Sequence, residues 1–350
     1  MTRDKPNKTI SQSRAEQSRA EQSRAEQSRA EQSRALRIGL IDVDGHNFPN
    51  LPLMKLSAWH KAQGDSVEWY NPLFSGHMDR VYKSKVFSFT QDYPYSIDAD
   101  EVISGGSGYA IELENGREHF LTERNNVLPD EIEHIYPDYS IYPELTKETA
   151  YGFLSRGCPR GCSFCHVAAK EGKCARKVAD LSEFWHRQKN IMLLDPNITA
   201  VPEWEDLFGQ LVESNSYIDI SQGIDARLLT EKKAEMLKQM KIKMVHLAWD
   251  RYEDGKVIVP KLQMLREITG WERHKCSVFV LVNFDTTTEQ DLERIYAIRD
   301  IGFQPYVMVY DKEHTTMNDT CRQIARWVNA VPIFRTVKTF EEYKNVRRSY

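Results

Sequence analysis

The sequence predicts an α/β protein in which six strand–helix units form a parallel sheet, curled into a barrel or partial barrel, behind a smaller α/β domain. From residue 148 onward, apolar runs of strand length alternate with helical patterns, as in a parallel sheet with crossover helices. A shorter strand–helix–strand pattern with glycine-rich exits precedes them and is typical of a small doubly wound sheet. A chain of 350 residues that is 41% hydrophobic can bury both cores.

Composition and charge exclude several classes of protein. The formal net charge is −4, so the chain is neither a general nucleic-acid coat nor a polybasic membrane binder. No apolar run approaches the roughly 18 to 20 residues of a membrane span, and the opening MTRDKPNKTI lacks a signal-peptide core. We therefore expect a cytoplasmic protein. Its six cysteines are too few for a disulfide framework, which directs attention to metal or redox chemistry.

Residues 1–35 form a low-complexity tail. The pentapeptide SRAEQ occurs four times in succession between Ser13 and Gln32, and the segment carries a net charge of +3. A five-residue period moves the alanines around a helix without forming an apolar stripe. We expect this tail to lie outside the folded domains.

The small domain is expected over residues 36–125. A strand at Leu36–Val43 ends in the turn Asp44–Asn47, and a helix over residues 51–63 is closed by Gly64. Further strands are expected at 67–70, 86–90 and 101–104, and a hairpin at 111–121 around Asn115-Gly116. The Pro- and Tyr-rich residues 126–147 are expected to form a linker.

The barrel is expected over residues 148–312, followed by an extension over 313–350. Its helical patterns include Glu231–Met240 and Glu289–Asp300. Polar clusters follow the strands, at the carboxyl ends where a parallel sheet carries its chemistry. The six expected strands are 150–155, 190–194, 217–221, 243–249, 276–283 and 305–310.

The strongest local signal is the loop Cys158-Pro159-Arg160-Gly161-Cys162-Ser163-Phe164-Cys165. Three thiolates on one loop can converge on a soft metal centre. A structural zinc is normally closed by four ligands, whereas a four-iron cluster held by three cysteines keeps one iron open. The spacing favours the cluster; the zinc alternative would recruit Cys174 or His166 as a fourth ligand.

The C-x3-C-x2-C motif after the first strand of a six-unit βα core resembles the radical S-adenosylmethionine (radical SAM) superfamily over residues 148–312, a partial (β/α)6 TIM-like barrel. The resemblance implies a [4Fe-4S] cluster on Cys158, Cys162 and Cys165, whose open iron binds S-adenosyl-L-methionine (SAM). It also implies reductive cleavage of SAM to a 5′-deoxyadenosyl radical. The electron would come from a cellular reductant of the flavodoxin or ferredoxin type.

The same resemblance implies which side chains contact SAM. Phe164 is the aromatic residue before the last cysteine, and Asp195 or Asn197 stands where relatives accept the SAM amino group. Arg227 would pair with the SAM carboxylate, and Asp250 would contact the ribose or amino group. Gln222 and Asp225 are the candidates for substrate binding at the mouth of the barrel. The alternative roles for the SAM candidates are helix caps, turns or surface ion pairs.

The small domain resembles the flavodoxin-like, cobalamin-binding type that precedes many radical SAM cores. The resemblance rests on the motif at residues 50–58, on residues 64–68 beyond it, and on Asp44-Gly45-His46. Pro49 replaces the glycine that closes the cobalamin signature. We therefore expect a cobalamin-like fold without bound cobalamin, with His46 as a turn residue.

Three functions remain open from the sequence. The first is a radical SAM enzyme acting on an unknown substrate, with a cobalamin-assisted methyltransferase as a variant. The second is a non-catalytic zinc-binding protein. The third is an electron-transfer protein with an open cluster and no affinity for SAM.

Overall fold

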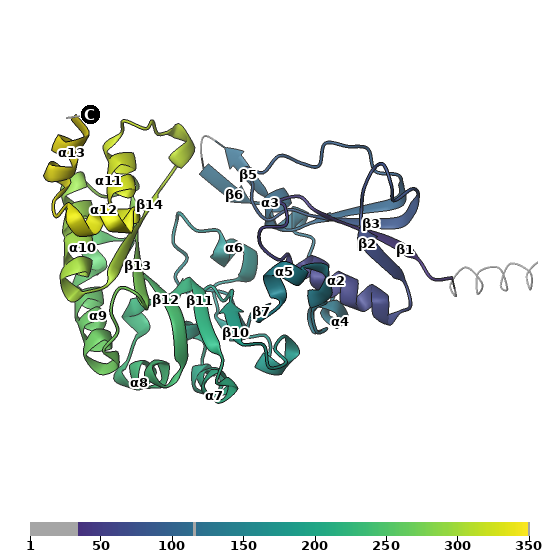
Figure 1. Cartoon of the computed structure of the whole chain (residues 1–350), viewed down its shortest axis with the longest axis horizontal. Helices are drawn as coiled ribbons and strands as arrows, with labels where there is room; N and C mark the ends of the chain where they lie inside the picture. The colour runs from purple at the N-terminus through teal and green to yellow at the C-terminus, as the bar shows by residue number, and fades with distance from the viewer. Residues whose placement is uncertain (1–33, 115–116, 349–350) are drawn as a thin grey trace, which may run out of the picture.

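The computed structural model describes residues 34–114 and 117–348, which are organised by two parallel sheets. We call residues 34–114 and 117–147 the small lobe and residues 148–348 the large lobe; the two lobes lie side by side (Figure 1). The predicted α/β class is confirmed. The repeats and the Asn115-Gly116 turn lie outside the described residues.

The small lobe contains a four-stranded sheet in the order β2-β1-β3-β4, with every neighbouring pair parallel. The side-chain oxygen of Asn50 accepts a hydrogen bond from the backbone N–H of Leu53 at 3.3 Å and so caps α2. The predicted helix over residues 51–63 is confirmed. The elements are β1 (Arg37–Asp42), α2 (Leu51–Ala62), β2 (Ser66–Trp69), β3 (Met78–Ser84) and β4 (Ala99–Gly105).

A helix covers one face of this small sheet, and a loop covers the other. Ile38 and Leu40 pack against α2, whereas Ile41 and Val81 pack beneath the segment 85–98. The strand expected at 86–90 is wrong: Asp44 holds this segment in turns, accepting hydrogen bonds from the backbone N–H of Val86 at 2.5 Å and of Phe87 at 3.3 Å. The sheet strand lies earlier, at β3.

The rest of the small lobe connects this sheet to the large lobe. Residues 126–147, expected as a linker, bury Ile132 and Tyr142 against the α2 side of the sheet. Asp138 accepts hydrogen bonds from Ser57 Oγ at 2.7 Å and from Lys61 Nζ at 2.5 Å, which fastens the segment to α2. The elements here are α3 (Ser107–Ala110), β5 (Ile111–Glu114), β6 (Arg117–Phe120), α4 (Asp130–Glu133) and α5 (Pro143–Thr146).

The large lobe contains a six-stranded parallel sheet whose strands are neighbours in sequence order. Each of the six strands predicted for this region overlaps one of them. The sheet strands are β7 (Thr149–Gly152), β10 (Asn190–Leu193), β11 (Tyr217–Ile224), β12 (Lys241–Ala248), β13 (Cys276–Val282) and β14 (Gln304–Val309).

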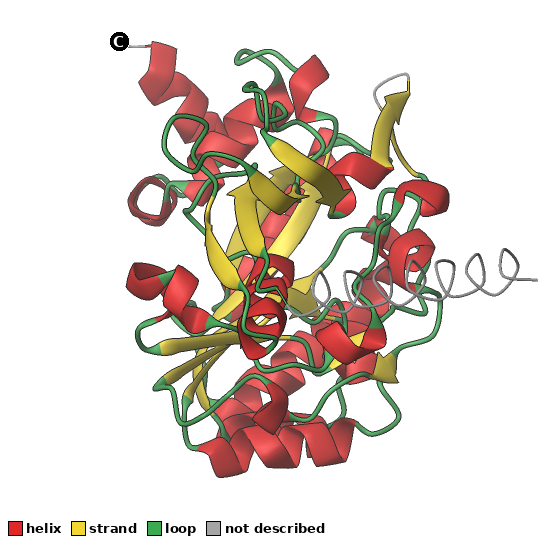
Figure 2. Ribbon diagram, turned by 90° about the vertical axis from the view of Figure 1, so that its right-hand side faces the viewer, coloured by secondary structure: helices red, strands yellow, loops and turns green. Residues whose placement is uncertain are grey.

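The helices of the large lobe pack against its sheet, and in Figure 2 they lie outside the central strands. A short antiparallel pair, β8 (Ser155–Arg156) and β9 (Arg176–Lys177), follows β7. None of the helices in the described part of the chain is both long and apolar enough to cross a membrane. The helices are α6 (Val167–Glu171), α7 (Trp204–Ser214), α8 (Glu231–Gln239), α9 (Gly255–Thr269), α10 (Thr288–Ile301), α11 (Thr320–Asn329), α12 (Val331–Thr336) and α13 (Phe340–Arg348).

The two faces of the large sheet differ. Residues at alternate positions, such as Ile220, Val245 and Val280, pack in one core with the helices. The intervening residues point to the opposite face, which we call the open face, and few of them are fully buried. The open face carries, from β7 to β14, Tyr151, Met192, Asp219, Ser221, Met244, His246, Phe279, Tyr306 and Met308.

Candidate functional site

The three motif cysteines lie on a loop that β8 and β9 close at its base. The pairs Ser155–Lys177 and Arg156–Arg176 face each other across this base. Gly157 has φ +85°, and a Cβ there would lie 2.2 Å from the carbonyl oxygen of Cys174, so only glycine fits. The backbone N–H of Cys158 donates to the carbonyl oxygen of Gly172 at 3.2 Å. The loop therefore leaves the sheet with a defined geometry.

Asp195, which follows β10, anchors the start of this loop. Its carboxylate accepts hydrogen bonds from the backbone N–H of Leu154 at 3.1 Å and from the N–H and Oγ of Ser155, both at 2.5 Å. The residue is fully buried, and burial raises the pKa of its carboxyl to about 6. Both oxygens are engaged, so a contact with a SAM amino group would require one of these bonds to open.

The side chain of Asn197 contacts one of the motif cysteines. Its Nδ2 donates to Cys158 Sγ at 3.6 Å, and its Oδ1 accepts a hydrogen bond from Thr199 Oγ1 at 2.9 Å. The side chain is buried. Asn197 was predicted as a contact of SAM, and the structure places its amide at a candidate metal ligand.

All six cysteines are free thiols. Burial raises the pKa of the Cys162 and Cys165 thiols, and negative charge at Asp250 and Cys158 raises both further. Among the described residues, no three His, Cys, Asp or Glu side chains lie close enough together to hold a metal ion. The donor chemistry fits a soft metal, because three thiols share one loop and influence one another's charge. To bind the metal, their sulfur atoms would have to converge.

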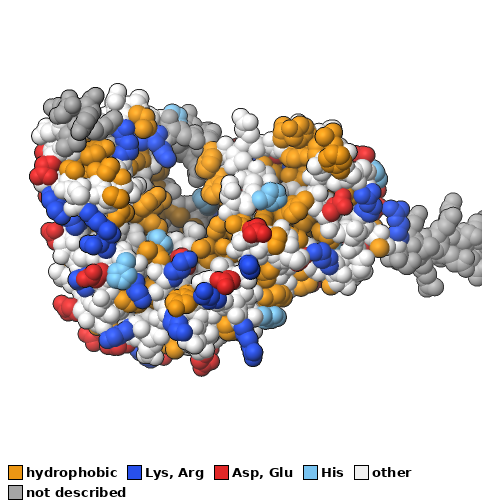
Figure 3. Space-filling model, in the orientation of Figure 1, with side chains coloured by type: hydrophobic (Ala, Val, Ile, Leu, Met, Phe, Trp, Pro, Cys, Tyr) orange, Lys and Arg blue, Asp and Glu red, His pale blue; other side chains and the backbone are white. Residues whose placement is uncertain are grey.

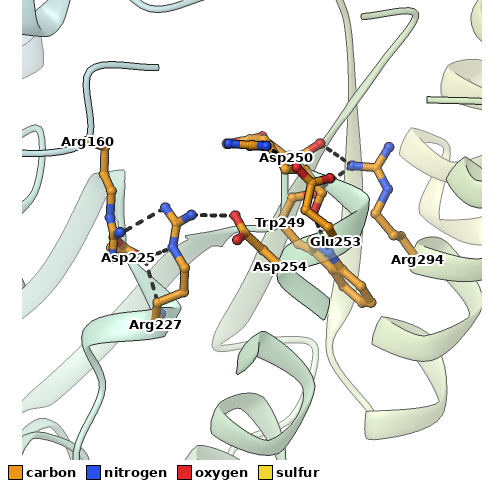
Figure 4. A network of polar contacts seen from close by, with 9 residues as sticks. Arg160, Asp225, Arg227, Trp249, Asp250, Glu253, Asp254 and Arg294 are labelled. Atoms are coloured by element: carbon orange, nitrogen blue, oxygen red, sulfur yellow. Dashed lines mark hydrogen bonds and ion pairs between the residues drawn. The ribbon is translucent and has the colours of Figure 1, made fainter. Parts of the chain in front are cut away.

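Four charged side chains form a chain of ion pairs beside the cysteine loop (Figure 4). Arg160 Nε pairs with Asp225 Oδ2 at 2.5 Å, and Arg227 Nε pairs with Asp225 Oδ1 at 2.8 Å. Arg227 also pairs with Asp254. The predicted residues Asp225 and Arg227 are thus neighbours, and both are already paired. Gln222 is exposed on the same strand end, with its Nε2 3.5 Å from Ser221 Oγ.

Asp250 stands on the next strand end. Burial raises the pKa of its carboxyl to about 6, against the opposing charges of Arg294 and Arg227. Arg294, a fully buried side chain of α10, donates to the carbonyl oxygens of Trp249 at 2.8 Å and Asp250 at 2.6 Å. The position of Asp250 is therefore fixed through its backbone, and Figure 4 shows Arg294 beside it.

The Asp250 carboxyl should make stability depend on pH. Its folded pKa of about 6 lies above the ordinary value of 3.8, so between these values the folded chain holds a proton that the unfolded chain releases. Stability from this group therefore falls as pH rises through this range and is constant above it. We expect wild type to lose about 2 kcal/mol relative to Asp250→Asn between pH 4 and pH 6. Urea unfolding of both proteins across this range measures the difference; parallel curves would contradict the assignment.

Aromatic side chains border the cysteine loop on the side of β13 and β14. The ring centroids of Phe164 and Phe284 lie 5.3 Å apart, and those of Phe284 and Tyr310 lie 4.8 Å apart, both edge to face. Phe164, a predicted contact of SAM, is thus packed against aromatic residues that follow β13 and β14, far away in sequence. Figure 3 shows an opening between the small lobe and the part of the large lobe that carries β14.

The open face of the large sheet carries two titratable groups that the sequence analysis did not single out. Asp219 Oδ1 and His246 Nδ1 are buried atoms without a hydrogen-bond partner in the described part of the chain. Burial raises the pKa of the Asp219 carboxyl and lowers that of the His246 imidazole. The His246 ring is stacked on Phe279 at 4.9 Å. Each group therefore has an unused hydrogen-bonding atom on this face.

These residues were missed for different reasons. Asp219 and His246 interrupt apolar strands, between Ile218 and Ile220 and between Val245 and Leu247, and this pattern could have identified them. The positions of Arg160, Asp254 and Arg294 depend on tertiary contacts, and no spacing in the sequence indicates them.

The cobalamin-like signature residues of the small lobe are engaged within the protein. The His46 ring lies 4.4 Å from the Trp69 ring and 5.8 Å from the Tyr142 ring. The Asp44 carboxylate holds the segment 86–90, accepting from Thr90 Oγ1 at 2.7 Å as well as from the backbone. His46 lies in the turn that follows β1.

No protein-family model matches the chain, and no curated protein matches it. What indicates a function is therefore the cysteine loop together with the side chains that the strand ends bring to it.

Proposed function

We propose that the protein is a radical SAM enzyme whose substrate is unknown. The observation that carries the proposal is the Cys158, Cys162, Cys165 loop at the carboxyl end of the first strand of a parallel sheet. The sequential strand order, with helices on one face and polar groups on the other, supports a partial (β/α)6 barrel whose interior is the open face. The polar and aromatic side chains at the same strand ends also support the proposal.

In this proposal the three cysteines hold a [4Fe-4S] cluster. When bound there, the cluster would supply the electron for reductive cleavage of SAM and so the radical chemistry of this class of enzyme. Asp195 fixes the start of the loop through the N–H groups of Leu154 and Ser155. A reductant of the flavodoxin or ferredoxin type would act as the electron donor.

The surrounding residues orient the reactants. Phe164 provides an aromatic wall, and Asp250 offers a carboxyl with a raised pKa. Arg227 binds the SAM carboxylate by exchanging one of its partners, Asp225 or Asp254, for the ligand. Asp219 and His246 supply unused hydrogen-bonding atoms for a substrate on the open face.

Anaerobic reconstitution of the protein with iron and sulfide tests this function. We expect about four irons per chain and 5′-deoxyadenosine formed from SAM when a reductant is added. Incubation with deuterated cell extract, followed by analysis of deuterium in the 5′-deoxyadenosine, identifies the substrate pool. One zinc and no iron per chain would favour the zinc-binding alternative, and an intact cluster without SAM cleavage would exclude the enzyme.

Asn197 should tune the cluster. A hydrogen bond from its Nδ2 to Cys158 Sγ favours the reduced, more negative state. A bond of about 1 kcal/mol corresponds to about 40 mV for one electron, so Asn197→Leu should lower the midpoint potential by about this amount. Thr199→Val, which removes only the hydrogen bond from Thr199 to Asn197, is the matched control. Potentiometry of the reconstituted proteins measures the shift; equal potentials for Asn197→Leu and wild type would show that the bond has no such role.

A further inference from the structure

A cavity of about 740 Å³ lies between the two lobes. One wall comes from α2, from the turn after β4 and from the segment 125–134. The other wall comes from Arg156, from the end of α6 and from β9, and Figure 1 shows α6 beside the small lobe. None of Asp225, Asp250 and Tyr310 lines the cavity. It is therefore separate from the proposed SAM site, and its volume suits a small organic molecule.

The large-lobe wall carries a lysine whose ammonium group makes no close ion pair among the described residues. Lys170 is partly buried and has no hydrogen bond or close ion pair within the described residues; the nearby charges that act on it are the Glu171 carboxylate and the Arg156 guanidinium, which oppose each other. Burial lowers the pKa of its ammonium. Partial burial of this charge without a close, hydrogen-bonded partner has a free-energy cost. An anion in the cavity would remove that cost.

The carboxylates that line the cavity are already paired. Glu171 binds Arg156 at 2.9 Å and the backbone N–H of Gly157 at 3.1 Å. Glu133 pairs with Lys55 at 3.0 Å, and Asp130 Oδ1 lies 3.5 Å from His134 Nε2. None of the three has an ion pair with Lys170. Lys170 is therefore a cation of the cavity wall whose hydrogen-bonding capacity is not used by these carboxylates.

The small-lobe wall is apolar. Leu53, Leu56 and Ile132 contribute buried side chains, and Val127, which is 69% exposed, stands at the edge. An apolar body packed here would lose water contact, which favours binding by about 25 cal/mol per Å². The two walls together suit a molecule with an apolar body and one charged end.

The turn after β4 brings the backbone to this cavity. Gly106 has φ +94°, and a Cβ there would lie 2.3 Å from the carbonyl oxygen of Lys85, so only glycine fits. At Gly105 an added Cβ would have its nearest neighbour at 3.6 Å. The turn lies at the carboxyl ends of β3 and β4, which is where parallel α/β sheets bind ligands.

We propose that this cavity binds a small organic anion, with its apolar body against α2 and residues 127–132 and its carboxylate or phosphate group paired with Lys170. The site extends beyond the proposed radical chemistry and does not depend on a cluster. It can therefore be tested on the full chain in either state, and its failure would leave the radical SAM proposal untouched.

The test uses two fluorescent probes with nearly the same body: 8-anilinonaphthalene-1-sulfonate, which is an anion, and N-phenyl-1-naphthylamine, which is neutral. We expect Lys170→Met to weaken binding of the anion about tenfold, the loss of one charge-assisted contact, and to leave the neutral probe unchanged. Lys173 is an exposed lysine outside the cavity, so Lys173→Met should change the affinity for neither probe. Phenyl phosphate and phenylacetate, used as competitors, distinguish a phosphate ligand from a carboxylate ligand.

A variant of the opposite wall makes the test independent of Lys170. Val127→Trp fills the edge of the cavity from an exposed position, so it should weaken the binding of both probes without unfolding the protein. Thermal melts monitored by circular dichroism confirm that the variants are folded. Equal affinity of the anionic probe for wild type and Lys170→Met, an equal loss in Lys173→Met, or no effect of Val127→Trp would overturn the proposal.

Discussion

Replacing Cys162 with serine is expected to remove the iron from the reconstituted protein and, with it, all formation of 5′-deoxyadenosine from SAM. The proposed cluster has only the three thiolates of Cys158, Cys162 and Cys165, and a serine oxygen is a poor substitute for a soft thiolate ligand. We expect the same result for Cys158→Ser and Cys165→Ser. The iron content of the purified variants should fall from about four atoms per chain to a small remaining amount.

Two other cysteines provide the controls. Cys174→Ser, in the same loop, and Cys321→Ser, in α11, should keep both iron and activity. Loss of metal in Cys174→Ser as well would indicate a four-cysteine site, which is the zinc-type arrangement. Retention of iron and SAM cleavage by Cys162→Ser would contradict the proposed cluster. Circular dichroism of each variant separates loss of metal from loss of fold.

The large sheet was predictable because its strands carry a strong signal. Segments such as Cys276–Val282 are apolar at nearly every position, and helical patterns between them, such as Glu231–Gln239, have polar faces. These patterns are local, so the sequence alone places all six strands to within a few residues. The helix α2 was predictable for the same reason, with Asn50 and Gly64 marking its two ends.

The small sheet was less predictable because β3 is locally polar. Arg80 and Lys83 alternate with its apolar residues, and their charges are satisfied by Glu101 at 2.6 Å and Asp92 at 2.7 Å. Phe87 and Phe89 resemble strand residues but are exposed and belong to no strand. Which segment pairs with β1 is decided by tertiary contacts, which local patterns do not contain.

The candidate site likewise contains one feature that the sequence predicts and others that depend on tertiary contacts. The spacing of the three cysteines is a local pattern, and this pattern by itself identifies the candidate metal loop. The role of Asp195 as an anchor depends on where Leu154 and Ser155 lie, about forty residues earlier in the chain. The contact of Asn197 with Cys158 likewise joins two strand ends. A sequence can name these polar residues after strands, but their partners follow only from the folded sheet.

Replacing Arg294 with methionine is expected to lower the free energy of unfolding by about 3–5 kcal/mol. The guanidinium is fully buried and donates to the carbonyl oxygens of Trp249, Asp250 and Leu281, at 2.8, 2.6 and 2.8 Å, and to Asp291 Oδ1 at 2.5 Å. These bonds fasten α10 to the ends of β12 and β13. Methionine would leave the Asp291 carboxylate buried without its cation, which is the main part of the cost.

Two further variants separate the buried charge from the lost packing. Arg294→Met combined with Asp291→Leu removes both charges, so it should recover part of the stability lost in the single variant. Arg299→Met, on the same helix but 30% exposed at the side chain, should cost less than about 1 kcal/mol. Urea unfolding provides the free energies. If Arg294→Met stayed within about 1 kcal/mol of wild type, the buried arginine would not be what fixes the strand end that carries Asp250, and the position of this carboxyl beside the cysteine loop would depend on the sheet alone.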